Sequence, residues 1–246
     1  MATSSKILDD LLSDLPADAP VRSVLVAVHW TVVCSRHCGL AATFMDDQTH
    51  GHGRVRGVGR LHTLTARELA EYARSDNRLE ASIGLAALNS LLDVDERQAQ
   101  EVNAADVLLE RGRGRRVALV GHFPFIARLA DTAAQLWVLE QQPIEGEYPA
   151  EAAPDLLPQA DVIAITGTTL INRTLDGLLA LCRPGATVML LGPSTPLSPV
   201  LFRHGVTLLS GARVVDEAAA LRTIAHGAAF PQVEGVRLLT LERHVS

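Results

Sequence analysis

The sequence predicts an α/β fold in two parts, an N-terminal α+β domain and a C-terminal Rossmann-like, doubly wound domain. Short apolar runs at residues 117–120, 162–165 and 187–191 each end in a loop rich in small or hydroxylated residues. Such runs, rich in Val, Ile and Leu and bounded by Gly and Pro, are typical of parallel strands covered on both faces. Helical patterns alternate with these runs, whereas strands precede helices in the first hundred residues. We place the domains at residues 1–100 and 101–246.

The N-terminal part is predicted to begin with a β-hairpin and to continue with helices. The hairpin arms span residues 21–33 and 39–44, and a Gly- and His-rich loop covers residues 46–60. Thr65 stands three residues before a glutamate, which is the spacing of a capping box. One helix should therefore start after Thr65, and a second one, with apolar residues at helical spacing, should cover residues 80–92.

From residue 103 onward, predicted strands and helices alternate. Asn103 is expected to cap a short helix that ends at Gly112. The later elements are, in chain order, strand 116–121, helix 124–134, strand 135–139, a Pro- and Glu-rich connection, strand 161–166, helix 174–182, strand 186–191, helix 197–204, strands 206–209 and 213–215, a helix between Asp216 and Gly227, and strand 236–239.

Composition excludes several classes of function. The chain has 246 residues, 48% of them hydrophobic, and a net charge of −6. An acidic protein is a poor partner for nucleic acid, because binding to phosphates needs a basic surface. The longest apolar stretch, residues 24–34, is much shorter than the roughly 20 residues that span a bilayer. We therefore expect a globular protein that binds neither nucleic acid nor a membrane.

The expected compartment is the cytoplasm. Residues 1–16 include three aspartates and lack the basic start and apolar core of a secretory signal. The three cysteines, Cys34, Cys38 and Cys182, cannot all pair with one another, which suits a reducing compartment.

NAD is not expected as a cofactor. Its fingerprint requires G-x-G-x-x-G directly after the first strand, so that the pyrophosphate approaches the backbone. Here Gly121 is followed by His122 and Phe123, whose side chains would block that approach. Lys6 is the only lysine and is remote from the strand-end loops in sequence, so Schiff-base chemistry and a phosphate-binding lysine are also excluded. An anion would have to be bound by backbone amides, hydroxyls or arginine.

Hydroxyl and amide groups follow the second and third apolar runs. In open α/β sheets, ligands bind beyond the carboxyl ends of the strands, where backbone amides and helix N-termini point outward. The residues of the predicted ligand site in these two loops are Thr166, Thr168, Thr169, Asn172, Gly192, Pro193 and Ser194. The structural alternative is that Asn172 or Thr174 caps the next helix and that the prolines shape a connection.

A histidine follows the first apolar run. His122 comes directly after Gly121, at the end of a predicted strand. In that place an imidazole can act as a metal ligand or as a general acid or base. The alternative is a structural histidine without a chemical role.

A second group of ligand-type residues lies at the hairpin tip. Cys34, His37 and Cys38 fall within five residues. In an extended chain the two thiols would be about 13 Å apart, too far for one metal ion, whereas a hairpin tip would bring them closer. The second C-x-x-C half of a zinc site is absent. A metal site and an ordinary polar loop therefore both stay open here.

The segments 161–172, 191–196, 121–124 and 80–89, together with Gly211, resemble the "putative heavy-metal chelation" family of bacteria and archaea. The resemblance covers nearly the whole chain. It implies an enolase-N-terminal-like domain packed on a Rossmann-like domain, with a metal-chelating cleft between them. The residues that would face this cleft are Glu80 and Asn89 from the first domain and Gly121, His122, Thr166, Asn172 and Ser194 from the second.

Two functional hypotheses follow. In the first, the cleft binds a divalent transition metal or a metal complex, with Glu80 and His122 as metal ligands; mixed nitrogen and oxygen ligands suit borderline ions. In the second, the protein is an enzyme for a small anionic metabolite, with His122 as acid or base and the amides of residues 166–172 stabilising negative charge. A binding module without chemistry is a third option. The sequence also leaves a homo-oligomer open.

Overall fold

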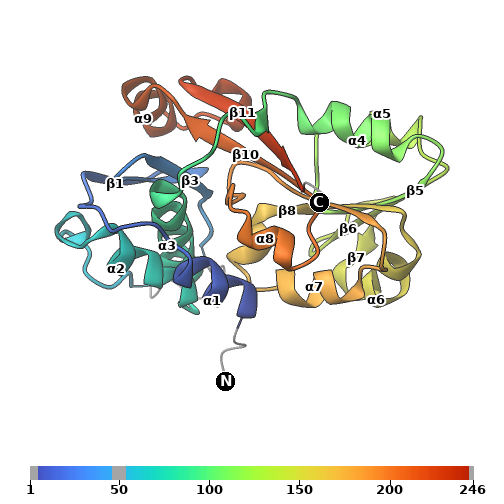
Figure 1. Ribbon diagram of the computed structural model, residues 1–246, viewed down its shortest axis with the longest axis horizontal. Helices are drawn as coiled ribbons and strands as arrows, with labels where there is room; N and C mark the ends of the chain where they lie inside the picture. Colours follow the sequence, from blue (N-terminus) through green and yellow to red (C-terminus); the bar gives the residue numbers. More distant parts are fainter. Residues whose placement is uncertain (1–4, 46–53, 244–246) are drawn as a thin grey trace.

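Two β-sheets organise the structure: a small antiparallel sheet of three strands and a separate large sheet of eight strands, most of which are parallel to their neighbours. The computed structural model describes residues 5–45 and 54–243 (Figure 1). The predicted mixed α/β fold is confirmed. Residues 46–53 of the predicted Gly- and His-rich loop lie outside the described residues.

The small sheet consists of β1 (Ser23–Val26), β2 (Trp30–Cys34) and β3 (Cys38–Ala42), in that order. The prediction of one continuous arm over residues 21–33 is wrong. A turn, at which the amide of Ala27 donates to the carbonyl of Trp30, divides this segment into β1 and β2.

Three helices accompany the small sheet. Helix α1 (Lys6–Ser13) was not predicted; the Ser5 hydroxyl caps it, and apolar residues at helical spacing are buried along one side. Helix α2 (Ala66–Ala70) starts with the predicted capping box, which is confirmed. Helix α3 (Arg78–Leu91) corresponds to the predicted helix 80–92.

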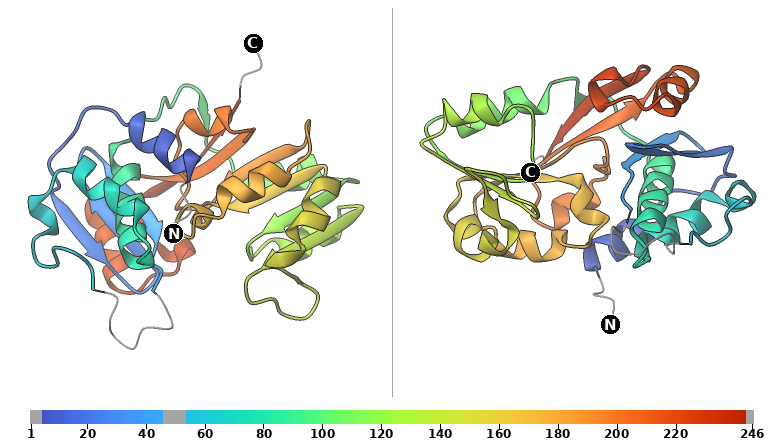
Figure 2. Two further views of the ribbon diagram at one scale, coloured as in Figure 1. Left: turned by 90° about the horizontal axis from the view of Figure 1, so that it is seen from below. Right: turned by 180° about the vertical axis from the view of Figure 1, so that it is seen from behind.

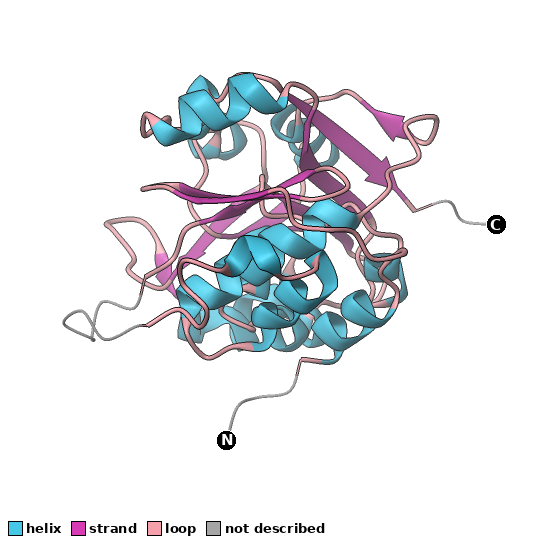
Figure 3. Ribbon diagram, turned by 90° about the vertical axis from the view of Figure 1, so that its left-hand side faces the viewer, coloured by secondary structure: helices cyan, strands magenta, loops and turns pink. Residues whose placement is uncertain are grey.

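Helix α3 lies unusually close to its neighbours. It packs on β2 and β3, and α2 packs on α3. Figure 3 shows helices crowded together in front of the strands on this side of the molecule. A Cβ atom at Gly39 would lie 2.1 Å from the carbonyl oxygen of Ala86 and 2.3 Å from the amide nitrogen of Ser90. Similarly, a Cβ atom at Gly84 would lie 1.9 Å from the amide nitrogen of Ala73. Only glycine permits this backbone spacing.

The second part of the chain forms the large sheet. Its strands are β4 (Ala99–Gln100), β5 (Arg116–Val120), β6 (Gln135–Glu140), β7 (Tyr148–Pro149), β8 (Val162–Thr166), β9 (Thr187–Leu191), β10 (Leu208–Val214) and β11 (Val236–Glu242). Its helices are α4 (Ala104–Gly112), α5 (Ile126–Ala130), α6 (Ala153–Leu156), α7 (Leu175–Leu181), α8 (Val200–Arg203) and α9 (Glu217–Ala225). Short 3-10 turns occur over Leu61–Thr63, Glu71–Arg74, Ala150–Ala152, Leu157–Gln159, Gly167–Leu170 and Phe230–Gln232.

The strand order of the large sheet is β4-β11-β10-β9-β8-β5-β6-β7. After β5, the chain adds β6 and β7 on one side and then returns to add β8, β9 and β10 on the other. The order therefore reverses between β5 and β8. Ligand sites of open α/β sheets lie at such a switch point, beyond the carboxyl ends of the strands.

Several predicted boundaries in the large sheet are corrected. The predicted strands 206–209 and 213–215 form one strand, β10, because the segment around Gly211 stays paired with β11. The helices predicted at 124–134 and 197–204 are reduced to the short α5 and α8. Strand β4, from the last residues of the first predicted domain, pairs with β11.

Helices cover both faces of the large sheet. Figure 1 shows α4 and α5 on one face and α6, α7 and α8 on the other. A third apolar cluster joins the small sheet to β10, β11 and α9, and Figure 2 shows these elements from two further sides. No helix within residues 5–45 and 54–243 is long and apolar enough to cross a bilayer.

Candidate functional site

The loops after β5 and β8 meet at the switch point of the large sheet. Gly121, directly after β5, has a φ of +115°, which side chains other than glycine rarely adopt. A Cβ atom there would lie 3.1 Å from the Cγ2 of Thr166, the last residue of β8. The two strand ends are thus in close contact, and a cavity opens on each side of them.

The larger of these cavities, about 570 Å³, extends from the small sheet to the ends of β5, β8 and β9. We call it the aromatic cavity. Trp30 and Ala42 border it from β2 and β3. It brings together part of the predicted site, namely His122, Thr166, Thr168, Gly192, Pro193 and Ser194. All three strand-end loops singled out in the sequence therefore border one space.

Aromatic rings provide much of the wall of the aromatic cavity. Phe123 and Phe125 are stacked, with ring centroids 5.2 Å apart and an interplanar angle of 15°. Trp30 and Phe230 meet edge to face at 5.4 Å. All four rings border the cavity. Such rings favour a ligand with a flat, apolar body over a small hydrated ion.

His122 is held by a carboxylate that the sequence analysis did not identify. Its Nδ1 lies 2.7 Å from the Oε1 of Glu147, whose side chain is only 8% exposed. The other carboxylate oxygen of Glu147 accepts from the amide of Ile144 at 3.1 Å. The Ile144 amide and then the His122 imidazole hold the pKa of Glu147 below its usual value. This contact fixes the ring and leaves Nε2 as the atom able to meet a ligand.

A second cavity of about 250 Å³ lies on the other side of the same strand ends. The predicted site residues that border it are Gly121, Thr166, Thr168, Thr169 and Asn172. Their polar groups are largely bonded to one another. The Thr169 hydroxyl donates to the Thr166 carbonyl at 2.7 Å, and the Asn172 side-chain oxygen accepts from the amide and hydroxyl of Thr174. Asn172 thus stabilises the turn before α7, but no described side chain caps that helix, so the predicted capping role is not confirmed.

Two hydrogen bonds, one from β3 and one from α3, reach the β9 loop beside the aromatic cavity. The amide of Ala42 donates to the Ser194 hydroxyl at 2.8 Å. The Asn89 amide group, on α3, donates to the carbonyls of Leu40 at 2.9 Å and Ser194 at 3.2 Å. Asn89 and Ser194 therefore do meet, and their polar groups connect the two sheets.

Glu80 has other partners. It is buried and borders neither of these two cavities. Its carboxylate accepts from the backbone amide and Nε of Arg56 and from the Ser75 hydroxyl. Burial alone would raise the pKa of Glu80, but the hydrogen bonds and the charge of Arg56 outweigh it, so the pKa is lowered. The structure pairs Glu80 and His122 with different side chains instead of with each other.

Cys34 and Cys38 form a disulfide across the hairpin. They are register partners in β2 and β3, with Cα atoms 4.0 Å apart, so the tip does bring them together as expected. His37 points elsewhere, toward Asp93 at 2.9 Å and Arg213 at 3.0 Å. Because two of the three cysteines pair, their number no longer supports a reducing compartment.

Comparisons with known proteins agree with this fold. A model of the DUF364 family, described as "Putative heavy-metal chelation", matches residues 103–242. A model of the DUF4213 family, with the same description, matches residues 8–92. The chain is thus an α/β protein with a large, mostly parallel sheet and a separate small antiparallel sheet. It belongs to the DUF364 family.

Two crystal structures of DUF364 proteins of unknown function are similar to this structure. The protein from Desulfitobacterium hafniense is 31% identical and superposes with a TM-score of 0.85 over 97% of this chain and 98% of its own. The protein from Pyrococcus horikoshii is 20% identical, with a TM-score of 0.79 over 97% and 99%, and supports the fold alone. A protein of Methanocaldococcus jannaschii described as uncharacterised is 26% identical over 86% of this chain and 85% of its own length.

Proposed function

We propose that the aromatic cavity binds a divalent transition metal that is already held by a planar organic chelator. The observation that carries this proposal is the mismatch between the size of the cavity and its ligand set. The cavity measures about 570 Å³. Among the described residues that line it, His122 is the sole His, Cys, Asp or Glu.

A bare ion would need more ligands than this. Protein sites for transition metals supply three or four nitrogen, sulfur or carboxylate ligands. One imidazole is too few for such a site, but it suffices to occupy one open position on a metal whose other ligands come from a chelator. Stacking on Phe123, Phe125 and Trp30 would bind the organic part. Glu147 would orient the His122 ring and raise its basicity as a ligand.

The test compares bare nickel(II) with its one-to-one complex with 1,10-phenanthroline, using protein purified without an affinity tag and calorimetric titration. We expect the complex to bind and the bare ion and free phenanthroline to bind much more weakly. His122→Ala should lower the affinity for the complex by about tenfold or more. His226→Ala, which removes an exposed histidine at the end of α9, is the matched control and should bind as the wild type does.

Two results would contradict the proposal. One is equal affinity for bare nickel and its complex, and the other is unchanged binding of the complex by His122→Ala. Binding of Glu80→Gln serves as a further check on the metal ligands expected from the family resemblance. Because Glu80 does not border the aromatic cavity, this variant should bind the complex as the wild type does, whereas a loss of affinity like that of His122→Ala would identify Glu80 as a ligand.

A second function is favoured by the same pair of side chains. A histidine held by a carboxylate at 2.7 Å is also the arrangement of a general acid or base. In this case a metal-free organic anion would be the ligand, and His122 would transfer a proton. A thermal-shift screen of small organic acids without added metal distinguishes the two functions, because only the enzyme hypothesis expects stabilisation under those conditions.

A further inference from the structure

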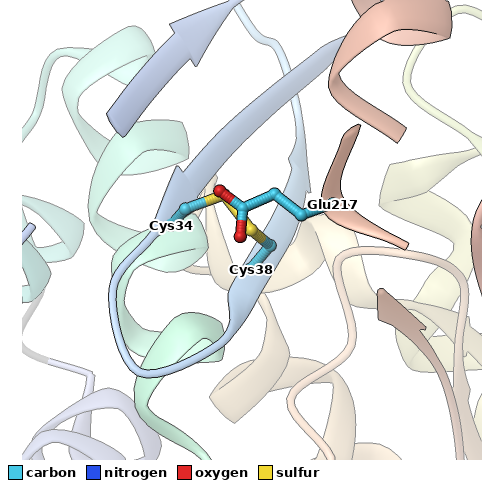
Figure 4. A group of neighbouring side chains, drawn as sticks. All are labelled: Cys34, Cys38 and Glu217. Carbon is cyan, nitrogen blue, oxygen red and sulfur yellow. A yellow bond between two sulfur atoms is a disulfide. The ribbon is translucent and has the colours of Figure 1, made fainter. Parts of the chain in front are cut away.

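Two cysteines and a glutamate meet between the small sheet and helix α9 (Figure 4). The cysteines end β2 and begin β3, and Glu217 is the first residue of α9. One ligand atom from each of Cys34, Cys38 and Glu217 lies within 4.8 Å of the other two. Among the described residues, this is the one group of three or more His, Cys, Asp or Glu side chains with that proximity. None of the three borders the aromatic cavity.

We propose that this group is a redox-gated site for a soft or borderline divalent cation, such as zinc or cadmium. A dithiol reductant cleaves the sulfur–sulfur bond by exchange: the reductant gives up two electrons and two protons and becomes a disulfide, and Cys34 and Cys38 become thiols. A divalent cation then binds both sulfurs and the Glu217 carboxylate, and the two thiol protons leave to the solvent.

The hairpin keeps the two cysteines opposite each other without help from the disulfide. The Ser35 amide donates to the His37 carbonyl at 2.8 Å, and the His37 amide donates to the carbonyl of Ser90 in α3 at 3.0 Å. The hydroxyls of Ser35 and Ser90 are 2.5 Å apart. After reduction, the sulfurs only need to separate to about 3.8 Å, the distance across a tetrahedral zinc with zinc–sulfur bonds of about 2.3 Å.

Arg22 holds the third ligand in place. Its guanidinium forms two bonds with the Glu217 carboxylate, at 2.9 Å and 2.8 Å. It is also tied to the hairpin, because its Nε donates to the Ser35 carbonyl and its amide donates to the Cys34 carbonyl. The carboxylate is therefore held in place by the same segment that carries the sulfurs.

The charges balance in both states. In the oxidised state, the positive charge of Arg22 balances the negative charge of Glu217. In the metal-bound state, the two thiolates add two negative charges and the cation adds two positive ones. A buried pair of thiolates without the cation would be left uncompensated, which is costly in a site where Cys34 is fully buried and Cys38 is 8% exposed. Thiolate should thus form only with the metal, and sulfur ligands select soft cations.

The full chain is reduced with dithiothreitol, freed of it without exposure to air, and titrated with cadmium chloride. Ultraviolet absorbance reports cadmium–thiolate bonds. We expect one cadmium per chain in the reduced protein and no cadmium–thiolate band in the oxidised protein. Cys34→Ser and Cys38→Ser should each lose the band, whereas Cys182→Ser, which removes the free cysteine, should keep it.

Glu217→Gln retains both thiols and tests the carboxylate. It should weaken cadmium binding by about tenfold or more, the effect expected for a lost ligand or its support. The matched control is Glu234→Gln, which breaks an exposed pair with Arg222 and should bind as the wild type does. Far-ultraviolet circular dichroism verifies that each variant is folded.

Three results would overturn the proposal. The disulfide could stay intact in folded protein under excess dithiothreitol, as a purely structural crosslink would. The reduced protein could bind no cadmium. Finally, Glu217→Gln could bind cadmium as tightly as the wild type. None of these readouts depends on the aromatic cavity, so this proposal can fail while the proposed function holds, and the reverse is also true.

Discussion

On one face of the small sheet, the two ends of the β2–β3 pair offer a ligand very different surroundings. Trp30 and Ala42 are partners at one end of the β2–β3 pair, and Cys34 and Cys38 are partners at the other. All four project from the same face, because side chains alternate along a strand. The first end borders a cavity of about 570 Å³ whose lining includes a single imidazole. At the second end, Cys38 borders a cavity of about 20 Å³. Two sulfurs and the Glu217 carboxylate nevertheless lie close together at that end of the strands.

Cavity space and metal ligands are therefore separate properties of the protein. A large, apolar cavity suits an organic body and needs few charged groups. A compact set of sulfur and oxygen atoms suits a bare ion and needs almost no space. The two proposed sites therefore differ in the kind of metal species that they would bind, and the following variants are chosen to separate them.

The largest effect on stability is expected for Gly39→Ala, which disturbs both ends at once. The new methyl group would lie 2.1 Å from the Ala86 carbonyl oxygen and force α3 away from β3. We expect the free energy of unfolding in urea to fall by more than about 3 kcal/mol. Gly177→Ala in α7, where a Cβ atom meets nothing within 4 Å, is the control and should gain about 0.5–1 kcal/mol. An unchanged stability of Gly39→Ala would show that α3 is not tightly apposed to β3.

Trp30→Ala should damage only the end that borders the aromatic cavity. It removes the contact with Phe230 and the hydrogen bond from Nε1 to the Ala228 carbonyl at 3.1 Å. We expect a loss of about 2 kcal/mol in the free energy of unfolding, since the ring is only half-buried. Thiol titration before and after reduction should still find the Cys34–Cys38 disulfide. Loss of this disulfide in the variant would mean that the two ends are not independent.

Glu80→Gln should act on stability without affecting the aromatic cavity. The variant loses a buried carboxylate that accepts from Arg56 and Ser75, and we expect a cost of about 1–2 kcal/mol at pH 7. The pKa of Glu80 is lower in the folded state than in the unfolded state. The contribution of this carboxylate to the free energy of unfolding is therefore complete above the unfolded pKa of about 4.3. The difference between wild type and variant should therefore shrink as the pH falls below that value. Urea unfolding at pH 7 and pH 4 measures this difference in stability. A difference that grows toward pH 4 would contradict the lowered pKa of Glu80.

The smallest effect on stability is expected for Glu147→Gln. The pKa of Glu147 is lowered by the Ile144 amide and by His122, so any contribution to stability is present above the unfolded pKa of about 4.3 and is lost on acidification. We expect a small decrease in melting temperature at pH 7 and a still smaller one at pH 4. Binding of the nickel–phenanthroline complex should nevertheless weaken, because the His122 ring loses its support. Unchanged binding would show that Glu147 does not orient this ligand.

Much of the large sheet and its strand-end loops was predictable from sequence. Short runs of Val, Ile and Leu gave the positions of β5, β8 and β9, and the parallel arrangement then places their carboxyl ends at one edge. The periodicity of 3.6 residues gave α3. In the region of β10, by contrast, the sequence predicted two strands with a break around Gly211. The strand continues because a glycine there allows close approach to the Thr195 carbonyl, 2.8 Å from where its Cβ would lie.

The partners of the candidate side chains were not predictable. Glu147 lies in an irregular connection, where no periodicity links it to His122. Glu217 begins a helix far along the chain from Cys34, and only the packing of α9 against the small sheet brings them together. The role given to Glu80 came from the family resemblance, and its contact with Arg56 depends on the path of a loop.

The hydrogen bond from the Ala42 amide to the Ser194 hydroxyl has a consequence for how a ligand enters. If the two sheets swung apart, this amide would be exposed to water, and so would the Ser194 carbonyl that accepts from Asn89. The rate of deuterium uptake at the Ala42 amide therefore reports how readily the two sheets separate. Entry through a permanently open mouth would leave its exchange slow and unaltered by the ligand, whereas entry by a hinge motion would make exchange fast in the free protein and slower in the bound one.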